Sequence, residues 1–280
     1  MKSSTVSSWP PSAVQRIKSL RTLVTNHDTY LLSHSSKQAQ ETLICFRNGD
    51  RFVLRPRGDL VVADSDIFEE VILGNVYCLE ARDVTGMTVL DIGAHTGIFA
   101  INALRLGANR VIAVEPNSSN FQTLERNVAL NKHYRLESHR AAIAPATGRM
   151  LCSPTNSGGH RFILGEQSAS DCDGFGTVLR PPELDALILE QAVDVLKIDC
   201  EGCEACIFQD CESLGSLRLV LTESHDPVGQ WRQRQAICDR LSHMGFEVTT
   251  VRECSLEEGN FAIVKAAKRP STGTEARASR

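Results

Sequence analysis

Two apolar segments that lie one helix length apart constrain the fold of this chain more than any other feature. Residues 89–92 read Val-Leu-Asp-Ile and run into the glycine-rich turn 93–97. Residues 111–114 read Val-Ile-Ala-Val and run into Glu115. In open α/β sheets, buried parallel strands of this kind end at the crevice where nucleoside-type ligands bind. We therefore expect a βαβ unit with a ligand site where the two segments end.

Strand-like and helix-like segments alternate along much of the remaining chain, which is typical of parallel βαβ units. Two further β-prone runs, 246–251 and 260–264, are joined by an acidic loop with a glycine and should pair antiparallel. A late antiparallel hairpin on an otherwise parallel sheet is not the dehydrogenase arrangement. The expected strands are 88–92, 110–115, 134–139, 194–199 and 217–223, and the expected helices lie near 97–106, 118–130, 203–213 and 229–244.

A smaller unit precedes this α/β region. Apolar runs at 42–46 and 52–54 flank an Asn-Gly-Asp turn and predict a hairpin, and residues 66–79 carry apolar side chains at helical intervals. This unit would serve as a cap or substrate wall, and the long segment 146–180 as a lid or acceptor-binding loop. The expected ranges are 1–40 for a peripheral segment with a short helix at 13–24, 41–85 for the extension, 86–265 for the ligand-binding domain, and 266–280 for a disordered tail.

Composition narrows the classes of partner. The chain has 280 residues, 42% of them hydrophobic, and a net charge of −4, which is not the basic balance of a nucleic-acid-binding protein. It contains no apolar run of about 18 residues and no export signal, so we expect a cytoplasmic protein without membrane contact. Its ten cysteines are then expected to be reduced thiols rather than disulfides.

The glycine-rich turn favours a cationic ligand. A dinucleotide fold would need glycine where His95 stands, and the carboxylate of Asp91 would repel a pyrophosphate. The same carboxylate would attract an ammonium and a sulfonium, by about 4 kcal/mol at 4 Å before desolvation is subtracted. Glycines allow close backbone approach, the following helix N-terminus suits a carboxylate, and Glu115 can accept both ribose hydroxyls. Together these features indicate S-adenosylmethionine.

Residues 193–204 form the second informative segment, because Asp199, Glu201 and Glu204 directly follow a buried strand. Asp199 and Glu201 should face the methyl group of the cofactor. No proline-aromatic loop of an amine or base methyltransferase follows, so a hydroxyl acceptor fits better. Asp199, Glu201 and His225 are the candidate proton acceptors. Alternatively, Glu201 caps a helix and His225 only bonds a loop carbonyl.

The cysteines of this segment resemble an iron–sulfur ligand run, but the final spacing is four residues rather than three. If the segment is helical, Cys203 and Cys206 share one face and pack inward, so we expect no metal centre. A divalent ion bound by Asp199, Glu201 and Glu223 is a separate hypothesis. The four cysteines concerned are Cys200, Cys203, Cys206 and Cys211.

The chain resembles the FkbM family of S-adenosylmethionine-dependent methyltransferases over approximately residues 52–265. The resemblance rests on 89–97, 110–117, 124–131, 184–185, 196–204 and Glu223, of which Lys-Ile-Asp-x-Glu-Gly at 197–202 is the most specific part. It implies O-methylation, often of a sugar or natural-product hydroxyl. The expected fold is α/β, a Rossmann-like class I methyltransferase with a mostly parallel seven-stranded sheet, a terminal antiparallel hairpin and a small N-terminal α+β extension. The expected cofactor-binding residues are Asp91, Gly93, Ala94, Gly97, Glu115, Pro116, Asn117, Ala142 and Asp199.

We therefore expect a methyltransferase that uses S-adenosylmethionine to methylate a hydroxyl on a small molecule, natural product or glycan. The alternatives are an RNA or protein methyltransferase and a cofactor-binding module without turnover. A nicotinamide oxidoreductase is disfavoured by His95 and Asp91. The sequence leaves the acceptor and the oligomeric state open.

Overall fold

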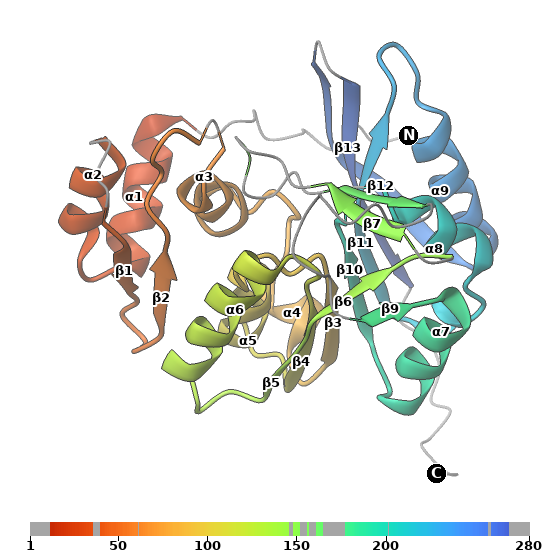
Figure 1. The fold of residues 1–280 in the computed structure, drawn as a ribbon, viewed down its shortest axis with the longest axis horizontal. Coiled ribbons are helices and arrows are strands. Elements are labelled where there is room, and N and C mark those ends of the chain that lie inside the picture. The colour runs from red at the N-terminus through yellow and green to blue at the C-terminus, as the bar shows by residue number, and fades with distance from the viewer. Residues whose placement is uncertain are drawn as a thin grey trace.

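The computed structural model describes residues 12–35, 40–60, 62–145, 148–151, 156, 161–164, 177–200, 202–256 and 259–268. Its centre is a seven-stranded sheet in the order β12-β13-β11-β10-β3-β4-β5 (Figure 1). All neighbouring strands are parallel except that β13 runs antiparallel to both β11 and β12. The expected fold class is confirmed. The strands are β3 (Thr88–Ile92), β4 (Arg110–Val114), β5 (Leu136–His139), β10 (Val195–Ile198), β11 (Leu219–Asp226), β12 (Phe246–Leu256) and β13 (Gly259–Lys268).

Helices cover both faces of this sheet, which is why its central strands are apolar on both sides. In β3, Val89 packs into one buried cluster, whereas Leu90 and Ile92 pack into the other. The first cluster includes α4 (Ala81–Val84), α5 (Ile98–Arg105) and α6 (Ser118–Leu130). The second includes α7 (Pro181–Glu190), α8 (Glu204–Asp210), the short helix η2 (Ser213–Ser216) and α9 (Arg232–His243).

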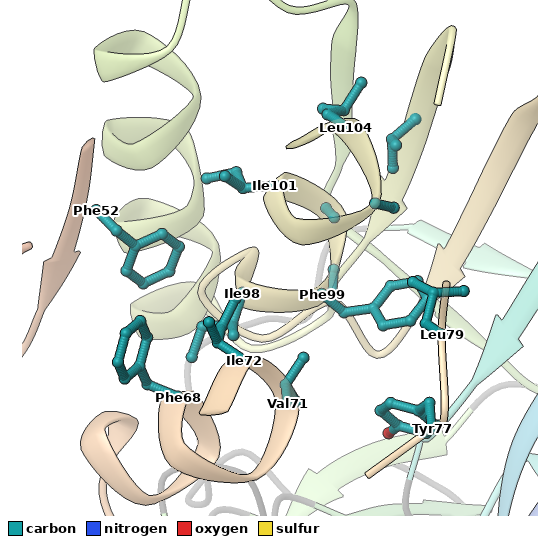
Figure 2. Close-up of a cluster of buried hydrophobic side chains, with 14 of the residues drawn as sticks. Phe52, Phe68, Val71, Ile72, Tyr77, Leu79, Ile98, Phe99, Ile101 and Leu104 are labelled. Carbon is teal, nitrogen blue, oxygen red and sulfur yellow. The ribbon is translucent and has the colours of Figure 1, made fainter. Parts of the chain in front are cut away.

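The N-terminal segments pack onto the α5–α6 side of the sheet (Figure 1). Phe52 and Phe68 share a buried cluster with Ile98 and Ile101 of α5, as Figure 2 shows. The extension therefore shares its core with the ligand-binding domain instead of forming one of its own. Its elements are α1 (Ala13–Leu23), α2 (His27–Ser35), β1 (Thr42–Cys45), β2 (Arg51–Leu54), α3 (Asp64–Phe68) and the π-helical turn η1 (Glu69–Leu73).

The hairpin predicted around the Asn-Gly-Asp turn is present as β1 and β2. The helix expected over 66–79 is too long, because α3 and η1 end at Leu73. Asn75 and Cys78 both have positive φ, which an L-residue adopts in turns and not within a helix. The helix therefore ends before Tyr77, and the direction of the Tyr77 side chain is not set by a helix face.

The segment 146–180 contains more regular structure than the expected loop. β7 (Gly148–Leu151) and β8 (Arg161–Leu164) form a hairpin, and β9 (Thr177–Leu179) pairs with β6 (Ala141–Ile143). At the other end, β13 continues through Lys268, so the start of the expected tail at 266 is wrong and the rest of that tail lies outside the described residues. None of the helices in the described parts of the chain combines the length and apolar character needed to span a bilayer.

Two asparagines of α6 attach the N-terminal hairpin to the domain. The Asn127 side chain accepts the Val53 N–H at 2.7 Å and donates to the Thr96 carbonyl at 2.9 Å. Asn131 accepts the Arg51 N–H at 3.0 Å and donates to the Arg51 carbonyl at 2.7 Å. On the edge of β2 that faces α6, these side-chain amides therefore make the backbone hydrogen bonds that a neighbouring strand would otherwise make.

We expect Asn127→Ala to lower the free energy of unfolding by about 2 kcal/mol or more, because it leaves the buried Val53 N–H and Thr96 carbonyl without a partner. Urea denaturation measures the change. Glu125→Ala, at an exposed position of the same helix, is the control and should change stability little. Equal losses in both variants would contradict the attachment.

Candidate functional site

A cavity of about 320 Å³ lies where β3, β4 and β10 end, beside Glu223 of β11. Of the residues predicted to bind a cofactor, those that line it are Gly93, Ala94, Glu115, Pro116 and Asp199. The extension supplies a second wall that includes Asp66, Glu70 and Tyr77, and the late hairpin supplies a third with Arg252 and Phe261. The cavity is thus enclosed by segments far apart in the sequence.

The glycine-rich turn has a strict steric requirement. Gly93 has φ +74, and a Cβ added there would lie 1.7 Å from the carbonyl oxygen of Asp199. Only glycine therefore lets the turn after β3 pack against the end of β10. Gly97 also has positive φ and is the N-cap of α5. It does not line the cavity.

Glu115 is held rigidly at the end of β4. Its two carboxylate oxygens accept the backbone N–H of His95 at 2.8 Å and of Asn117 at 2.9 Å. Burial raises the pKa of Glu115 to about 7, although these N–H groups favour the charged form. The site thus presents a fixed acceptor pair with remaining lone pairs, which suits the two hydroxyls of a ribose.

Asp91, Asn117 and Ala142 are placed behind the cavity surface. Asn117 is the N-cap of α6 and accepts the N–H of Asn120, and Ala142 is buried in β6. Asp91 is completely buried, with the Lys197 ammonium 3.1 Å from its Oδ1. The direct attraction of Asp91 for the cations of a cofactor, expected from the sequence, is therefore offset by a neighbouring positive charge.

Lys197 is the main site residue that the sequence interpretation missed. It also donates to the Gly93 carbonyl at 2.7 Å and lies 3.8 Å from Asp199 Oδ2. Burial disfavours the charged ammonium, but the charges of Asp91 and Asp199 outweigh this and raise the pKa of Lys197. A lysine within the apolar run of β10 was the available indication, because buried lysines need a partner.

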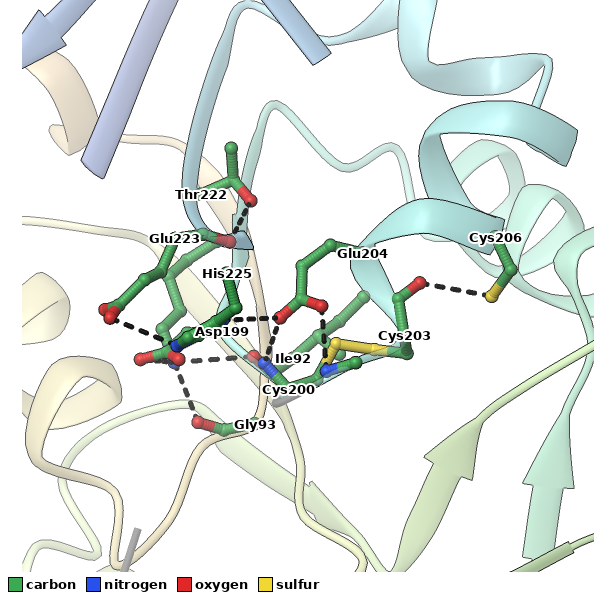
Figure 3. The surroundings of a disulfide bond; sticks show 12 residues. Ile92, Gly93, Asp199, Cys200, Cys203, Glu204, Cys206, Thr222, Glu223 and His225 are labelled. Atoms are coloured by element: carbon green, nitrogen blue, oxygen red, sulfur yellow. Dashed lines mark hydrogen bonds and ion pairs between the residues drawn. A yellow bond between two sulfur atoms is a disulfide. The ribbon is translucent and has the colours of Figure 1, made fainter. Parts of the chain in front are cut away.

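The candidate proton acceptors occupy different positions. Asp199 lines the cavity, and its Oδ2 accepts the Tyr77 hydroxyl at 2.8 Å. His225 lies behind Glu223, with Nε2 3.4 Å from Glu223 Oε1, and it is Glu223 that lines the cavity (Figure 3). Glu201 lies outside the described residues. Neither Tyr77 nor Glu223 was predicted to take part in proton transfer.

The cysteine segment differs from expectation. Cys200 and Cys203 form a disulfide (Figure 3) because the turn after β10 brings their Cα atoms to 5.7 Å, so the prediction of reduced thiols is wrong for this pair. Cys206 and Cys211 are free, and the Cys206 thiol donates to the Cys203 carbonyl at 3.1 Å. Among the described residues, no group of three His, Cys, Asp or Glu side chains is placed to hold a metal ion.

The fold and this site define a class I S-adenosylmethionine-dependent methyltransferase domain. The family described as "Methyltransferase FkbM domain" matches residues 91–248, which is more than half of the chain. The chain belongs to this family. The cofactor predicted from the sequence, S-adenosylmethionine, is confirmed.

Curated relatives share only a short segment. Ribosomal protein L11 methyltransferase of Thermotoga maritima is 44% identical over 57 residues, which is 20% of this chain and 22% of that protein. The Escherichia coli protein of the same name is 40% identical over 53 residues, which is 19% of this chain and 18% of that protein. The chain thus spans about a fifth of the length of these relatives.

The chain also aligns with solved structures. A putative RNA methyltransferase from Pyrococcus horikoshii has a TM-score of 0.39 at 17% identity, covering 75% of this chain and 85% of that one. A putative S-adenosylmethionine-dependent methyltransferase from Streptococcus mutans has a TM-score of 0.48 at 12% identity, covering 83% of this chain and 57% of that one.

The observed residues fit this cofactor. Gly93 and Glu115 both line the cavity, so a cofactor bound there would lie against the backbone of the turn after β3 and beside the Glu115 carboxylate. The carboxylates of Asp199 and Glu223 lie on the same cavity wall and suit a sulfonium.

We expect Lys197→Met to destabilise the fold by about 3–5 kcal/mol, because it leaves the carboxylate of Asp91 buried without its partner. The double variant Asp91→Asn/Lys197→Met should recover much of the loss. Urea denaturation of the two variants and the parent measures both effects. If Lys197→Met alone were as stable as the parent, the pairing of Lys197 with Asp91 would be contradicted.

Glu115 predicts a specific pH dependence. Its folded-state pKa of about 7 exceeds the ordinary 4.5, so this residue contributes stability below pH 4.5 that is lost as the pH rises through 7. Glu115→Gln removes this dependence, and its stability relative to the parent should rise by about 3 kcal/mol between pH 4.5 and 8. Denaturation at several pH values measures it, with Glu125→Gln as the exposed control. Parallel pH curves would contradict the shift.

Proposed function

We propose that the protein transfers a methyl group from S-adenosylmethionine to a hydroxyl on a small molecule, natural product or glycan. The observation that carries this proposal is the cavity, in which Glu115 directly follows β4, Asp199 directly follows β10, and the carboxylate of Glu223 comes from within β11. A hydroxyl that accepts the methyl group between these carboxylates could pass its proton to a carboxylate in the same cavity.

The residues of the chain would have separate roles in binding the cofactor, positioning the methyl acceptor and accepting its proton. When bound, the cofactor supplies an electrophilic methyl group on a sulfonium. Glu115 would orient its ribose, and the Gly93 turn would let its methionyl portion approach the backbone. Asp199, fixed by the Tyr77 hydroxyl, would hold the acceptor in line with the methyl group, because such displacements depend mainly on positioning. The proton acceptor would be one of Asp199, Glu201 and His225, the last acting from behind Glu223.

The charged side chains that line the cavity favour a methyl acceptor that carries no negative charge. Asp66, Glu70, Asp199 and Glu223 all line the cavity, and the Arg252 guanidinium lies 3.5 Å from Glu70 and over the Phe261 ring. Lys197 and Arg252, which also line the cavity, are each already paired with a carboxylate and would have to give up that partner to bind a phosphate, so RNA is the less favoured alternative. A protein lysine side chain remains compatible with carboxylates, and the partial relatives are ribosomal protein methyltransferases by name.

Other sequence expectations stay predictions. They are the absence of nucleic-acid and membrane partners, the cytoplasmic location, and the roles of Asp91, Gly97, Asn117 and Ala142 around the cofactor. A cofactor-binding module without turnover is the remaining alternative.

Titration with S-adenosylhomocysteine by calorimetry tests the cofactor half of the proposal. The parent should bind, and Glu115→Gln should bind roughly tenfold more weakly, since one charged acceptor is lost. Glu125→Gln is the matched control and should bind like the parent. No heat from the parent at millimolar ligand would overturn the proposal.

The acceptor half is tested by the release of S-adenosylhomocysteine from S-adenosylmethionine in the presence of candidate acceptors. Neutral polyols and glycosides should support turnover, and their phosphorylated counterparts should not. A lysine-containing peptide and an RNA serve as the alternative acceptors. Turnover with either of these alone would replace the hydroxyl acceptor by that class, and binding without turnover would favour the regulatory module.

A further inference from the structure

The disulfide between Cys200 and Cys203 has no part in the methyl transfer proposed above. It lies in the turn between β10 and α8, directly after Asp199 (Figure 3). Cys200 lines the cavity, whereas Cys203 is only 5% exposed. The bond therefore joins the wall of the functional site to the core behind it.

A buried carboxylate holds this turn independently of the disulfide. Glu204 is completely buried, and its two oxygens accept the N–H of Cys200 at 3.1 Å and of Gly202 at 2.8 Å. These hydrogen bonds do not depend on the oxidation state of the sulfurs. The 5.7 Å Cα separation is also within the usual range for a disulfide, so the turn presents the two thiols ready to pair.

Neighbouring thiols are poorly suited to exchange with this pair. Burial raises the pKa of Cys206 to about 11 and that of Cys211 to about 12. Since the thiolate is the attacking species, both are scarce nucleophiles at neutral pH. The bond should therefore remain between Cys200 and Cys203 when it is broken and formed again.

The turn also contacts the cofactor-binding turn. A Cβ added to Gly93 would lie 3.3 Å from Cys200 Cα, which places the two backbones in direct contact. A reagent that reaches Cys200 from the cavity passes through space that a bound cofactor or acceptor would fill.

We propose that Cys200 and Cys203 are a reversible thiol–disulfide site that small disulfides and dithiols reach through the cavity, so that an occupied cavity protects it. In oxidation, two thiols and one low-molecular-weight disulfide give the protein disulfide and two small thiols. In reduction, a dithiol is oxidised to its own disulfide, and its two protons pass to the thiols of both cysteines. The identity of the occupant as the cofactor rests on the proposed function.

The parent protein tests reversibility without substitution. It is equilibrated with mixtures of reduced and oxidised glutathione, quenched with acid, alkylated with iodoacetamide, and analysed by peptide mass spectrometry. Cys200 and Cys203 should become protected together as the oxidised fraction rises, and dithiothreitol should release both. Alkylation of both cysteines at every glutathione ratio, or protection of either one alone, would overturn the site.

The rate of reduction by dithiothreitol tests the access route. At S-adenosylhomocysteine about ten times its Kd, only about one eleventh of the molecules have an open site, so reduction should slow about tenfold. The free and exposed Cys78 is an internal control whose alkylation rate should not change. Cys206→Ser should leave both the disulfide and its protection unchanged, whereas Cys203→Ser should leave Cys200 open to alkylation.

The outcomes separate this proposal from the proposed function. Binding of S-adenosylhomocysteine by calorimetry with an unchanged reduction rate would overturn access through the cavity and leave the methyltransferase intact. Absence of binding would overturn the proposed function together with the protection, while the glutathione titration would still decide reversibility.

Discussion

The site depends on one buried ammonium. Lys197 of β10 contacts the carboxylate of Asp91 on β3, the carbonyl of Gly93 in the following turn, and, at longer range, Asp199. These groups come from adjacent parallel strands, and their burial requires charge balance. The ammonium therefore holds the ends of β3 and β10 together. The residues at these ends, Gly93, Lys197 and Asp199, line the cavity and form what we call its floor.

The walls above this floor come from outside the central strands. The extension contributes Tyr77, which orients Asp199, and it is anchored by aromatic packing against α5 and by the two asparagines of α6. The late hairpin contributes Arg252 and Phe261 because β13 inserts between β11 and β12. Sheet topology thus explains why residues so distant in sequence enclose one space.

Local patterns were sufficient for the core of the fold. Apolar runs and glycines predicted β3, β4, β10 and β11 and their helices to within a few residues, and the family resemblance is confirmed. Glu115, Gly93 and Asp199, which the sequence indicated as cofactor-binding residues, line the cavity, and their role there stays a prediction. Contacts between distant segments were not predictable in this way. Tyr77 reaches Asp199 only because the preceding helix ends at Leu73, and the pairing of Lys197 with Asp91 requires the strand register. The disulfide was missed because the compartment argument ignored how tightly the turn after β10 closes.

The separate origin of the floor and the walls has a consequence for substitutions. The residues proposed to contact the cofactor lie at strand ends whose geometry is fixed by glycine sterics and buried charge, so substitutions there would disturb the fold. Glu70, Arg252 and Phe261 line the same cavity from η1 and the late hairpin, outside the strands β3, β4 and β10. Under the proposed function, substitutions at these three positions could therefore alter the choice of acceptor without disturbing the strand ends that would hold the cofactor.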